Sequence, residues 1–203
     1  MQNKKLLLAT KNKGKAREYR ALLRGAPYEI STMAEQGFSM DIEETGASFE
    51  ENASLKATTL AATSGLLSLA DDSGLEVDAL GGEPGVRSAR YAGEDVTDAD
   101  LVKYLLSRIE NVPDEQRTAR FRCVIAIATP DGKVELCPGE CGGIIAREPR
   151  GENGFGYDPV FYVPEMGKTM AELTFEEKNR VSHRARAAEK AREVLMRIYH
   201  SRD

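Results

Sequence analysis

Apolar residues along the chain recur at two spacings, one typical of strands and the other typical of helices. Short apolar or alternating runs predict strands, and two of the longest flank the turn residues Pro130-Asp131-Gly132 as a hairpin. The predicted strands are Lys5–Thr10, Tyr28–Ser31, Leu66–Asp72, Leu75–Ala79, Thr118–Ala128, Lys133–Cys141 and Val160–Val163. The chain therefore has strands near both ends and a hairpin in its middle.

Helices are predicted between these strands, partly from residues that start or stop a helix. Ser48 with Glu51 three residues later forms a capping box, which opens a helix that runs to about Ser64. Gly65 then occupies the position just beyond the helix end, where glycine is favoured. The other predicted helices are Lys13–Leu23, a helix from Thr97 to about Ile109, and a C-terminal segment with Ala188, Ala191, Leu195 and Ile198 at spacings of three and four.

This order of elements indicates an α/β protein with a mixed central sheet flanked by helices, and with two lobes around a cleft. The chain contains no repeat, low-complexity tract or linker. Its 203 residues are enough for a two-lobed domain with a substantial core. We therefore expect residues 1–203 to form a single two-lobed domain.

Composition and charge exclude several classes of protein. The chain is 41% apolar and 30% charged, which is ordinary for a soluble globular protein. Its net charge of −5 argues against broad nucleic-acid binding, which needs a basic surface, but allows a local basic pocket for a small anion. Its apolar stretches are shorter than the ~20 residues of a membrane span, and the N-terminal run is too short for a signal peptide. We therefore expect a cytoplasmic protein without a membrane or nucleic-acid partner.

The cysteines give no sign of a metal site. Cys123, Cys137 and Cys141 are odd in number, which fits reduced thiols. Cys137 and Cys141 are four residues apart, but no further cysteine or nearby histidine completes a zinc set. Half-buried structural cysteines are the expected arrangement.

The most informative segment is Asp71-Asp72-Ser73-Gly74, at the predicted end of a buried strand. Unpaired carboxylates are costly to bury, so a strand that ends in two of them needs a cation or water there. A hard cation such as Mg²⁺ commonly takes one or two carboxylates together with phosphate oxygens. Side chains alternate along a strand, which places Asp71 and Asp72 on opposite faces without indicating which would hold a metal. The same four residues are also good turn formers.

Two further charged segments have both an ordinary and a functional interpretation. Thr10–Lys15 joins the first strand to a helix, and a helix N-terminus with nearby lysines can bind an anion. It is not a Walker A loop, and taken alone it is best explained as a solvated lysine-rich turn. Glu43 and Glu44 form a second acidic pair, which is either a surface loop or a partner of the Asp71–Asp72 pair; spacing does not decide between these.

The C-terminal third carries two more candidate segments. In the glycine-rich stretch 151–159, Phe155 and Tyr157 could stack on a base, and Asp158 could accept hydrogen bonds from base N–H groups. A turn with buried aromatic residues explains this stretch equally well. Further on, His183 and Arg184 fall in the first turn of the last helix, where cations oppose the helix dipole unless they serve an anionic ligand. A solvated helix start is the alternative.

Taken together, these segments resemble the Ham1-like family of inosine/xanthosine triphosphate pyrophosphatases. The segments that carry the resemblance are Leu8–Lys15, Ser48–Ala57, Ala70–Leu80, Pro84-Gly85 with Ser88–Tyr91, Gly154–Pro159 and Ser182–Arg184. They follow in order over nearly the whole chain. The resemblance implies a two-lobed α/β fold with a central cleft, usually in a homodimer. It also implies Mg²⁺-dependent hydrolysis of non-standard purine nucleoside triphosphates (ITP, dITP, XTP) to the monophosphate and pyrophosphate.

The resemblance also implies roles for individual residues. Asp72 matches the family's general base and metal ligand, and Glu43 matches its acidic metal partner. Lys11 stands where bacterial members often have glycine. The residues that match substrate contacts are Thr10, Lys11, Asn12, Lys13, Gly14 and Lys15 in the phosphate loop, Phe155, Gly156, Tyr157 and Asp158 in the base-binding turn, Lys178, His183 and Arg184 near the C-terminus, and Lys56 and Ser73. Asp71 is left as a supporting carboxylate without an assigned role.

The implied reaction is attack by water on the α-phosphorus, which requires a positioned base and cations along the triphosphate. Two alternatives remain open. One is a Maf-like pyrophosphatase of the same broad fold that acts on modified or pyrimidine nucleotides, and the other is a nucleotide sensor without catalysis. A panel of nucleoside triphosphates, scored for pyrophosphate release, separates the three.

Overall fold

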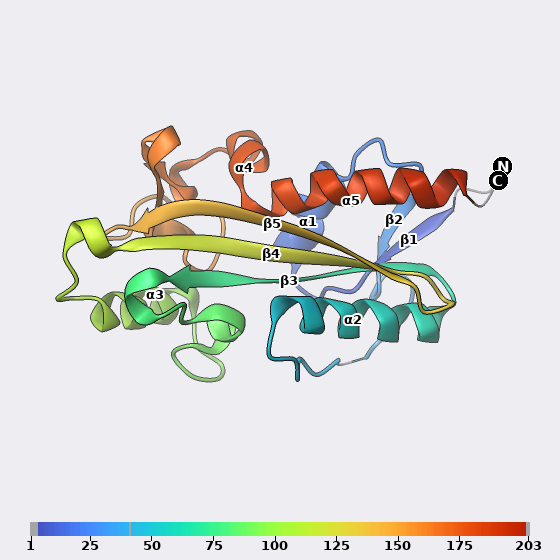
Figure 1. The fold of residues 1–203 in the computed structure, drawn as a ribbon, viewed down its shortest axis with the longest axis horizontal. Coiled ribbons are helices and arrows are strands. Elements are labelled where there is room, and N and C mark those ends of the chain that lie inside the picture. The colour runs from blue at the N-terminus through green and yellow to red at the C-terminus, as the bar shows by residue number, and fades with distance from the viewer. Residues whose placement is uncertain (1–3, 41, 202–203) are drawn as a thin grey trace. The chain divides into compact units, whose positions relative to one another are not determined.

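The computed structural model describes residues 4–40 and 42–201, and within them the strands form one mixed sheet (Figure 1). The strands are β1 (Lys5–Leu8), β2 (Glu29–Thr32), β3 (Leu67–Val77), β4 (Thr118–Ala128), β5 (Val134–Ile145), β6 (Phe161–Val163) and β7 (Lys168–Thr169). Their order is β2-β1-β3-β4-β5-β6-β7. Strand β1 pairs in parallel with β2 and β3, whereas β6 pairs antiparallel with β5 and β7. The prediction of a mixed sheet flanked by helices is confirmed.

The helices begin where the sequence supplies capping side chains. They are α1 (Lys13–Leu22), α2 (Phe49–Ser64), α3 (Asp98–Arg108), α4 (Phe175–Val181) and α5 (His183–His200). Ser48 accepts a hydrogen bond from the Glu51 amide, as predicted, but the Glu51 carboxylate bonds to Ala47 N, so the reciprocal half of the capping box is shifted by one residue. Gly65 ends α2 with a φ of 68°, a conformation that favours glycine.

The chain divides into two compact units. The first unit comprises residues 1–72, 123–139 and 184–203, and the second comprises 73–122 and 140–183. Each has its own apolar core: β1, α1 and α5 contribute to the core of the first unit, and α3 and β6 contribute to that of the second. The expectation of a cleft within a single two-lobed domain stays a prediction.

One boundary prediction was wrong, and it changes the setting of the two aspartates. Strand β3 runs without a break to Val77, so Asp71 and Asp72 lie in mid-strand rather than at a strand end. Leu75 and Val77 are fully buried in the core of the second unit, and this packing outweighs the turn preference of Ser73-Gly74. The segment predicted as a separate strand, Leu75–Ala79, is therefore the second half of β3 followed by a short 3₁₀ turn.

Two elements were not predicted. They are β7 and α4, both too short to show a periodic apolar pattern. The available signal was a capping box at the start of α4, where Thr174 and Glu177 bond reciprocally. All three cysteines are outside any disulfide and are fully buried rather than half-buried.

Candidate active site

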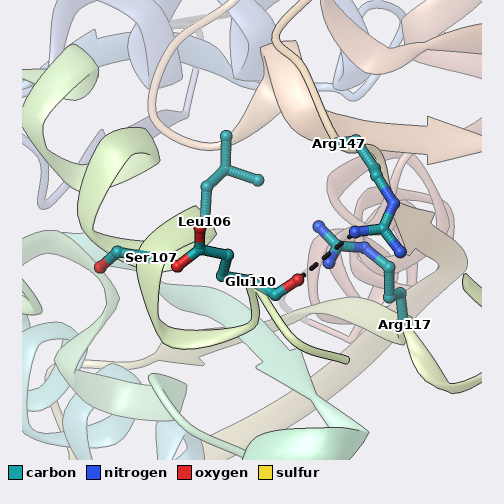
Figure 2. Close-up of a pocket in the computed structure, with 5 residues that line it drawn as sticks. All are labelled: Leu106, Ser107, Glu110, Arg117 and Arg147. Atoms are coloured by element: carbon teal, nitrogen blue, oxygen red, sulfur yellow. Dashed lines mark hydrogen bonds between the residues drawn. The ribbon is translucent and has the colours of Figure 1, made fainter. Parts of the chain in front are cut away.

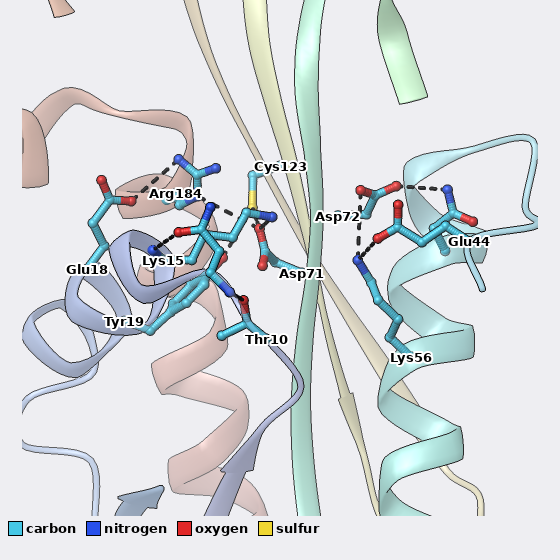
Figure 3. Close-up of polar contacts among 12 residues, drawn as sticks. Thr10, Lys15, Glu18, Tyr19, Glu44, Lys56, Asp71, Asp72, Cys123 and Arg184 are labelled. Atoms are coloured by element: carbon cyan, nitrogen blue, oxygen red, sulfur yellow. Dashed lines mark hydrogen bonds and ion pairs between the residues drawn. The ribbon is translucent and has the colours of Figure 1, made fainter. Parts of the chain in front are cut away.

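The aspartate pair on β3 presents its two carboxylates to opposite faces of the sheet, as the strand parity predicted. Figure 3 shows Asp71 pointing toward α1 and α5, and Asp72 pointing toward α2. Both side chains are buried, at 3% and 5% exposure. Each therefore needs its own set of compensating partners within the first unit.

Asp71 is surrounded by cations. Its Oδ2 atom lies 2.9 Å from Lys15 Nζ and 3.8 Å from Arg184 Nε. The Cys123 thiol lies 4.0 Å from the same oxygen. Burial alone would raise the pKa of Asp71, but Lys15, Arg184 and Lys56 outweigh it and lower the pKa to about 2. Asp71 is thus ionised throughout the ordinary pH range and serves as a fixed counter-charge.

The first turn of α1 carries Lys15 to that carboxylate. Asn12 is the N-cap of α1, and its Oδ1 atom accepts a hydrogen bond of 3.0 Å from Lys15 N. The backbone N–H of Asn12 in turn donates to Thr10 Oγ1 at 3.2 Å. Lys11, Asn12 and Lys13 are exposed, and no acidic residue stands in the first turn of α1. A helix start with exposed lysines and no acidic side chain favours an anion.

Arg184 links this face of β3 to α1 by a second contact. Its guanidinium is buried, and its NH1 atom lies 3.4 Å from Glu18 Oε2. Burial would lower the pKa of Arg184, but Glu18 and Asp71 raise it above its ordinary value. Arg184 is a predicted substrate contact, and Glu18 is a neighbour that the sequence analysis did not single out. The signal available was a charged residue on the buried side of α1.

Asp72 has a different set of partners, supplied by α2 and by the loop before it. Asn52 Nδ2 donates to Asp72 Oδ2 at 2.9 Å, and Lys56 Nζ lies 3.9 Å from Asp72 Oδ1. Lys56 also contacts Glu44 Oε1 at 2.5 Å. Burial, together with the nearby Glu44, raises the pKa of Asp72 above its ordinary value despite the opposing effects of Lys56 and Asn52. The neutralisation of Asp72 is therefore incomplete, in contrast to that of Asp71.

Lys56 is the cation of this second cluster. Burial would lower the pKa of Lys56, but Asp71, Glu44 and Asp72 outweigh it and raise the pKa. Lys56 therefore stays charged at the α2 face of β3. This places Lys56, a predicted substrate contact, beside the predicted base.

The acidic loop is brought to Asp72 through Glu44. The resemblance assigned the metal-ligand role to Glu43, whose side chain is exposed, so that role stays a prediction. Among residues 4–40 and 42–201, no group of three or more His, Cys, Asp and Glu side chains could hold a metal ion. Two carboxylates, Asp72 and Glu44, share one ammonium group instead. A position that attracts an ammonium between carboxylate oxygens also suits a hard cation that takes its remaining ligands from water and phosphate.

In the second unit, the predicted base-binding turn is built around Asp158. Its buried Oδ2 atom accepts hydrogen bonds from Lys178 Nζ at 2.7 Å and from Phe155 N at 3.0 Å. The Lys178 ammonium also lies 5.0 Å from the centre of the Phe155 ring. The structure thus brings together three of the predicted substrate contacts, Phe155, Asp158 and Lys178.

The rest of the turn is tied to its surroundings in the same unit. Gly156 N donates to Asp98 Oδ2 at 2.7 Å, and the buried Tyr157 donates its hydroxyl to Ser88 O at 2.8 Å. The sequence analysis did not single out Asp98, and it named Ser88 only within a segment that carries the resemblance, because a local pattern does not report a contact across this many residues. His183 is buried and stacks on Phe121, with ring centres 4.8 Å apart. Ser73 is half-buried on β3.

Known proteins are similar to this chain over nearly its whole length. The model of the Ham1 family matches residues 6–194. The chain belongs to the Ham1 family. A dITP/XTP pyrophosphatase of Desulforamulus reducens is 53% identical over 195 residues, which cover 96% of this chain and 97% of the relative. The dITP/XTP pyrophosphatase of Bacillus subtilis is 49% identical over 192 residues, covering 95% and 97%.

Solved structures of Ham1 proteins share the fold. A HAM1 protein from Coxiella burnetii superposes with a TM-score of 0.88 at 45% identity, covering 96% of this chain and 99% of that one. The Staphylococcus aureus Ham1 protein gives a TM-score of 0.86 at 42% identity, covering 95% and 98%. The mixed sheet described above is therefore the Ham1 fold.

Two cavities in the second unit of this Ham1 family member are lined by arginines, which are residues that can bind an anionic ligand. They measure about 310 and 340 Å³ and share Arg117 and Arg147 (Figure 2). The Arg117 guanidinium, however, donates to the carbonyl oxygens of Ile109, Ile145 and Ala146. Arg147 pairs with Asp114 at 2.7 Å. These guanidinium groups hold the end of α3 against the sheet, which explains them without a ligand.

None of the helices in residues 4–40 and 42–201 combines the length and the apolar character that a bilayer-spanning helix needs.

Proposed function

We propose that the protein hydrolyses non-standard purine nucleoside triphosphates, namely dITP, ITP and XTP, to the monophosphate and pyrophosphate. The observation that carries this proposal is the arrangement around β3, where Lys15 is held at one face and Asp72 stands with Lys56 and Asn52 at the other. The membership in the Ham1 family and the names of the relatives, dITP/XTP pyrophosphatases, support the same activity.

The phosphate-binding residues that we propose lie in the first unit. The start of α1, with Thr10 to Lys15, offers backbone N–H groups and the exposed charges of Lys11 and Lys13. Lys15 is fixed by its contact with Asp71, so its charge is in place before substrate arrives. A cation that is already ordered loses little freedom on binding a phosphate, which favours binding.

Asp72 is the proposed general base. Its pKa is raised by burial, and Asn52 fixes one of its oxygens, so the other is oriented to accept a proton from an attacking water. Attack on the α-phosphorus breaks the bond to the bridging oxygen and releases pyrophosphate. Lys56 stands beside the base as a cation that can stabilise the negative charge of the transition state.

Mg²⁺ is the proposed cofactor. Asp72 and Glu44, with Glu43 next to it in the chain, are the residues that would hold it, and their oxygen donors suit a hard cation. When bound, Mg²⁺ neutralises phosphate charge and lowers the pKa of a coordinated water.

Base recognition is proposed for the Phe155–Asp158 turn and for the buried side chains of Lys178 and His183, all in the second unit. Arg184, in the first unit, is proposed as a further substrate contact. A site built to hydrogen-bond the 6-oxo edge of a purine leaves polar groups unpaired when a 6-amino purine binds, which disfavours ATP. The salt bridge between Lys178 and Asp158 fixes this turn in advance. We further propose that the protein acts in the cytoplasm, where free buried cysteines stay reduced, and that it is a homodimer.

The test is a panel of nucleoside triphosphates incubated with purified protein in H₂¹⁸O, with and without Mg²⁺. We expect pyrophosphate from dITP, ITP and XTP, with ¹⁸O in the monophosphate product, and little product from ATP. Release of orthophosphate, or ¹⁸O in the pyrophosphate, would contradict attack on the α-phosphorus. A preference for pyrimidine or modified nucleotides would indicate a Maf-like activity, and binding without Mg²⁺-dependent product would indicate a nucleotide sensor.

A further inference from the structure

Asn52 is a buried polar side chain that joins the proposed base to the acidic loop. It lies near the start of α2 and is 2% exposed. Its Nδ2 atom donates to Asp72 Oδ2 at 2.9 Å, and its Oδ1 atom accepts from Gly46 N at 2.8 Å. Both contacts lie within the first unit. A buried amide with both ends bonded to defined partners has a fixed orientation.

The hydrogen-bonding groups around Asn52 allow only one orientation of its side-chain amide. The backbone N–H of Gly46 can only donate, so it must face the oxygen of Asn52. The NH₂ group of Asn52 is thereby turned toward Asp72, whose ionised carboxylate can only accept. The backbone N–H of Gly46 therefore determines that Asn52 turns its NH₂ group, and not its oxygen, toward Asp72.

Gly46 has no room for a side chain at this contact. A Cβ atom there would lie 2.7 Å from Asn52 Oδ1, 2.7 Å from Glu51 Cβ and 3.0 Å from Asn52 N. The backbone at Gly46 can approach the start of α2 only because the residue is glycine. Two residues earlier in the same loop, Glu44 contacts Lys56.

We propose that Asn52 is a positioning residue of the reaction, held by Gly46 so that it fixes Asp72 Oδ2 and leaves Oδ1 directed at Lys56 and the reacting atoms. The proposal rests on the function proposed above. In this proposal, the Asn52 side-chain amide fixes the position of Asp72 relative to the loop that contains Gly46. Asn52 acts through Asp72 and does not itself touch substrate.

The decisive variant is Asn52→Asp, which keeps the shape of the side chain and its acceptor for Gly46 N. It removes the donor to Asp72 and replaces it with a like charge. A role limited to packing and to the Gly46 contact predicts near wild-type turnover. Positioning through Nδ2 predicts a kcat reduced about 10–100-fold, the usual cost of losing a hydrogen bond that orients a reactive ligand, with a KM for dITP within about twofold.

Two further variants keep the test decisive if Asn52→Asp does not fold. Asn52→Ala removes donor and acceptor without adding charge, and Gly46→Ala displaces the loop while leaving Asn52 intact. The matched control is Ser54→Ala, which removes the hydrogen bond from Ser54 to Glu50 O on the same helix, with no contact to Asp72. We expect a reduced kcat in Asn52→Ala and in Gly46→Ala, and an unchanged kcat in Ser54→Ala.

A second readout does not depend on turnover. Mn²⁺ binding, measured by electron paramagnetic resonance without nucleotide, should weaken about tenfold in Asn52→Ala and stay unchanged in Ser54→Ala. Circular dichroism confirms that each variant is folded. Wild-type kcat and wild-type Mn²⁺ affinity in folded Asn52→Ala would overturn the proposal. If the wild-type protein released no pyrophosphate from any nucleotide, the proposed function would fail instead, so the two failures are distinguishable.

Discussion

The two faces of β3 at Asp71 and Asp72 use the same residue type for different purposes. Asp71 meets Lys15 and Arg184, and its pKa is lowered to about 2 despite burial. Asp72 meets a neutral amide at 2.9 Å and an ammonium only at 3.9 Å, and burial raises its pKa. Neighbouring carboxylates thus differ because the pleat of the strand turns them toward different helices.

This difference shows how one strand can carry both a structural carboxylate and a basic carboxylate at adjacent positions. A carboxylate with full charge compensation is a poor base, because its cations stabilise the ionised form. A carboxylate that is partly desolvated and held by one hydrogen bond keeps its basicity. We therefore propose that Asp71 holds the start of α1 and that Asp72 takes part in the reaction, and each prediction below separates the two faces.

The largest effect is expected at the Asp72 face. Asp72→Asn keeps the size of the side chain and removes the base, so kcat for dITP should fall about 10²–10⁴-fold. Pyrophosphate release measures this directly. The free energy of unfolding should change little, because Lys56 keeps its contact with Glu44. Near wild-type turnover in the folded variant would remove Asp72 from the mechanism.

The next effect concerns stability at the Asp71 face. Asp71→Asn leaves Lys15 and the buried Arg184 without their shared counter-charge, which should lower the free energy of unfolding by about 3–5 kcal/mol. Urea denaturation followed by circular dichroism gives the value. A loss below about 1 kcal/mol would show that Glu18 and solvent compensate both cations.

The pH dependence of the free energy of unfolding tests the lowered pKa of Asp71. The folded-state pKa of Asp71 is about 2, below the ordinary value of 3.8, so its contribution is present above about pH 4 and is lost as the pH falls toward 2. The difference corresponds to about 2 kcal/mol. We expect the stability gap between wild type and Asp71→Asn to shrink by that amount between about pH 5 and pH 2. A gap that stays constant would contradict the assigned pKa.

The smallest effect separates Lys15 from its exposed neighbour. Lys15→Met removes the lysine that Asp71 holds in place, and we expect the KM for dITP to rise about tenfold, equivalent to about 1.4 kcal/mol. Lys11→Met is compared with it, because the exposed Lys11 belongs to the same proposed phosphate-binding segment, and we expect a smaller rise in KM there. Steady-state kinetics of the two variants measures the difference. Equal effects would mean that the tether to Asp71 has no role in substrate binding.

Much of this arrangement could be predicted from local pattern. The cap at Ser48, the glycine at 65 and the opposite faces of Asp71 and Asp72 follow from rules that act over a few residues. The continuity of β3 did not follow, because the burial of Leu75 in a distant core overrode a local turn preference.

The partners of the charged groups could not be predicted for the same physical reason. The contact of Asn52 with Asp72 spans 20 residues, and that of Gly46 with Asn52 requires a loop conformation. Local periodicity carries no information on such pairs. The resemblance to the Ham1-like family implied which residues take part, and those roles stay predictions. The contact of Glu44 with Lys56 was visible only in the structure.

The division of tasks between the two faces is the central claim, and one crossed measurement tests it most directly. Asp71→Asn and Asp72→Asn are compared for kcat of pyrophosphate release from dITP and for free energy of unfolding. The account predicts a large loss of kcat with little loss of stability in Asp72→Asn, and a large loss of stability with a much smaller loss of kcat in Asp71→Asn. The reverse pattern, or equal losses of kcat in both folded variants, would contradict it.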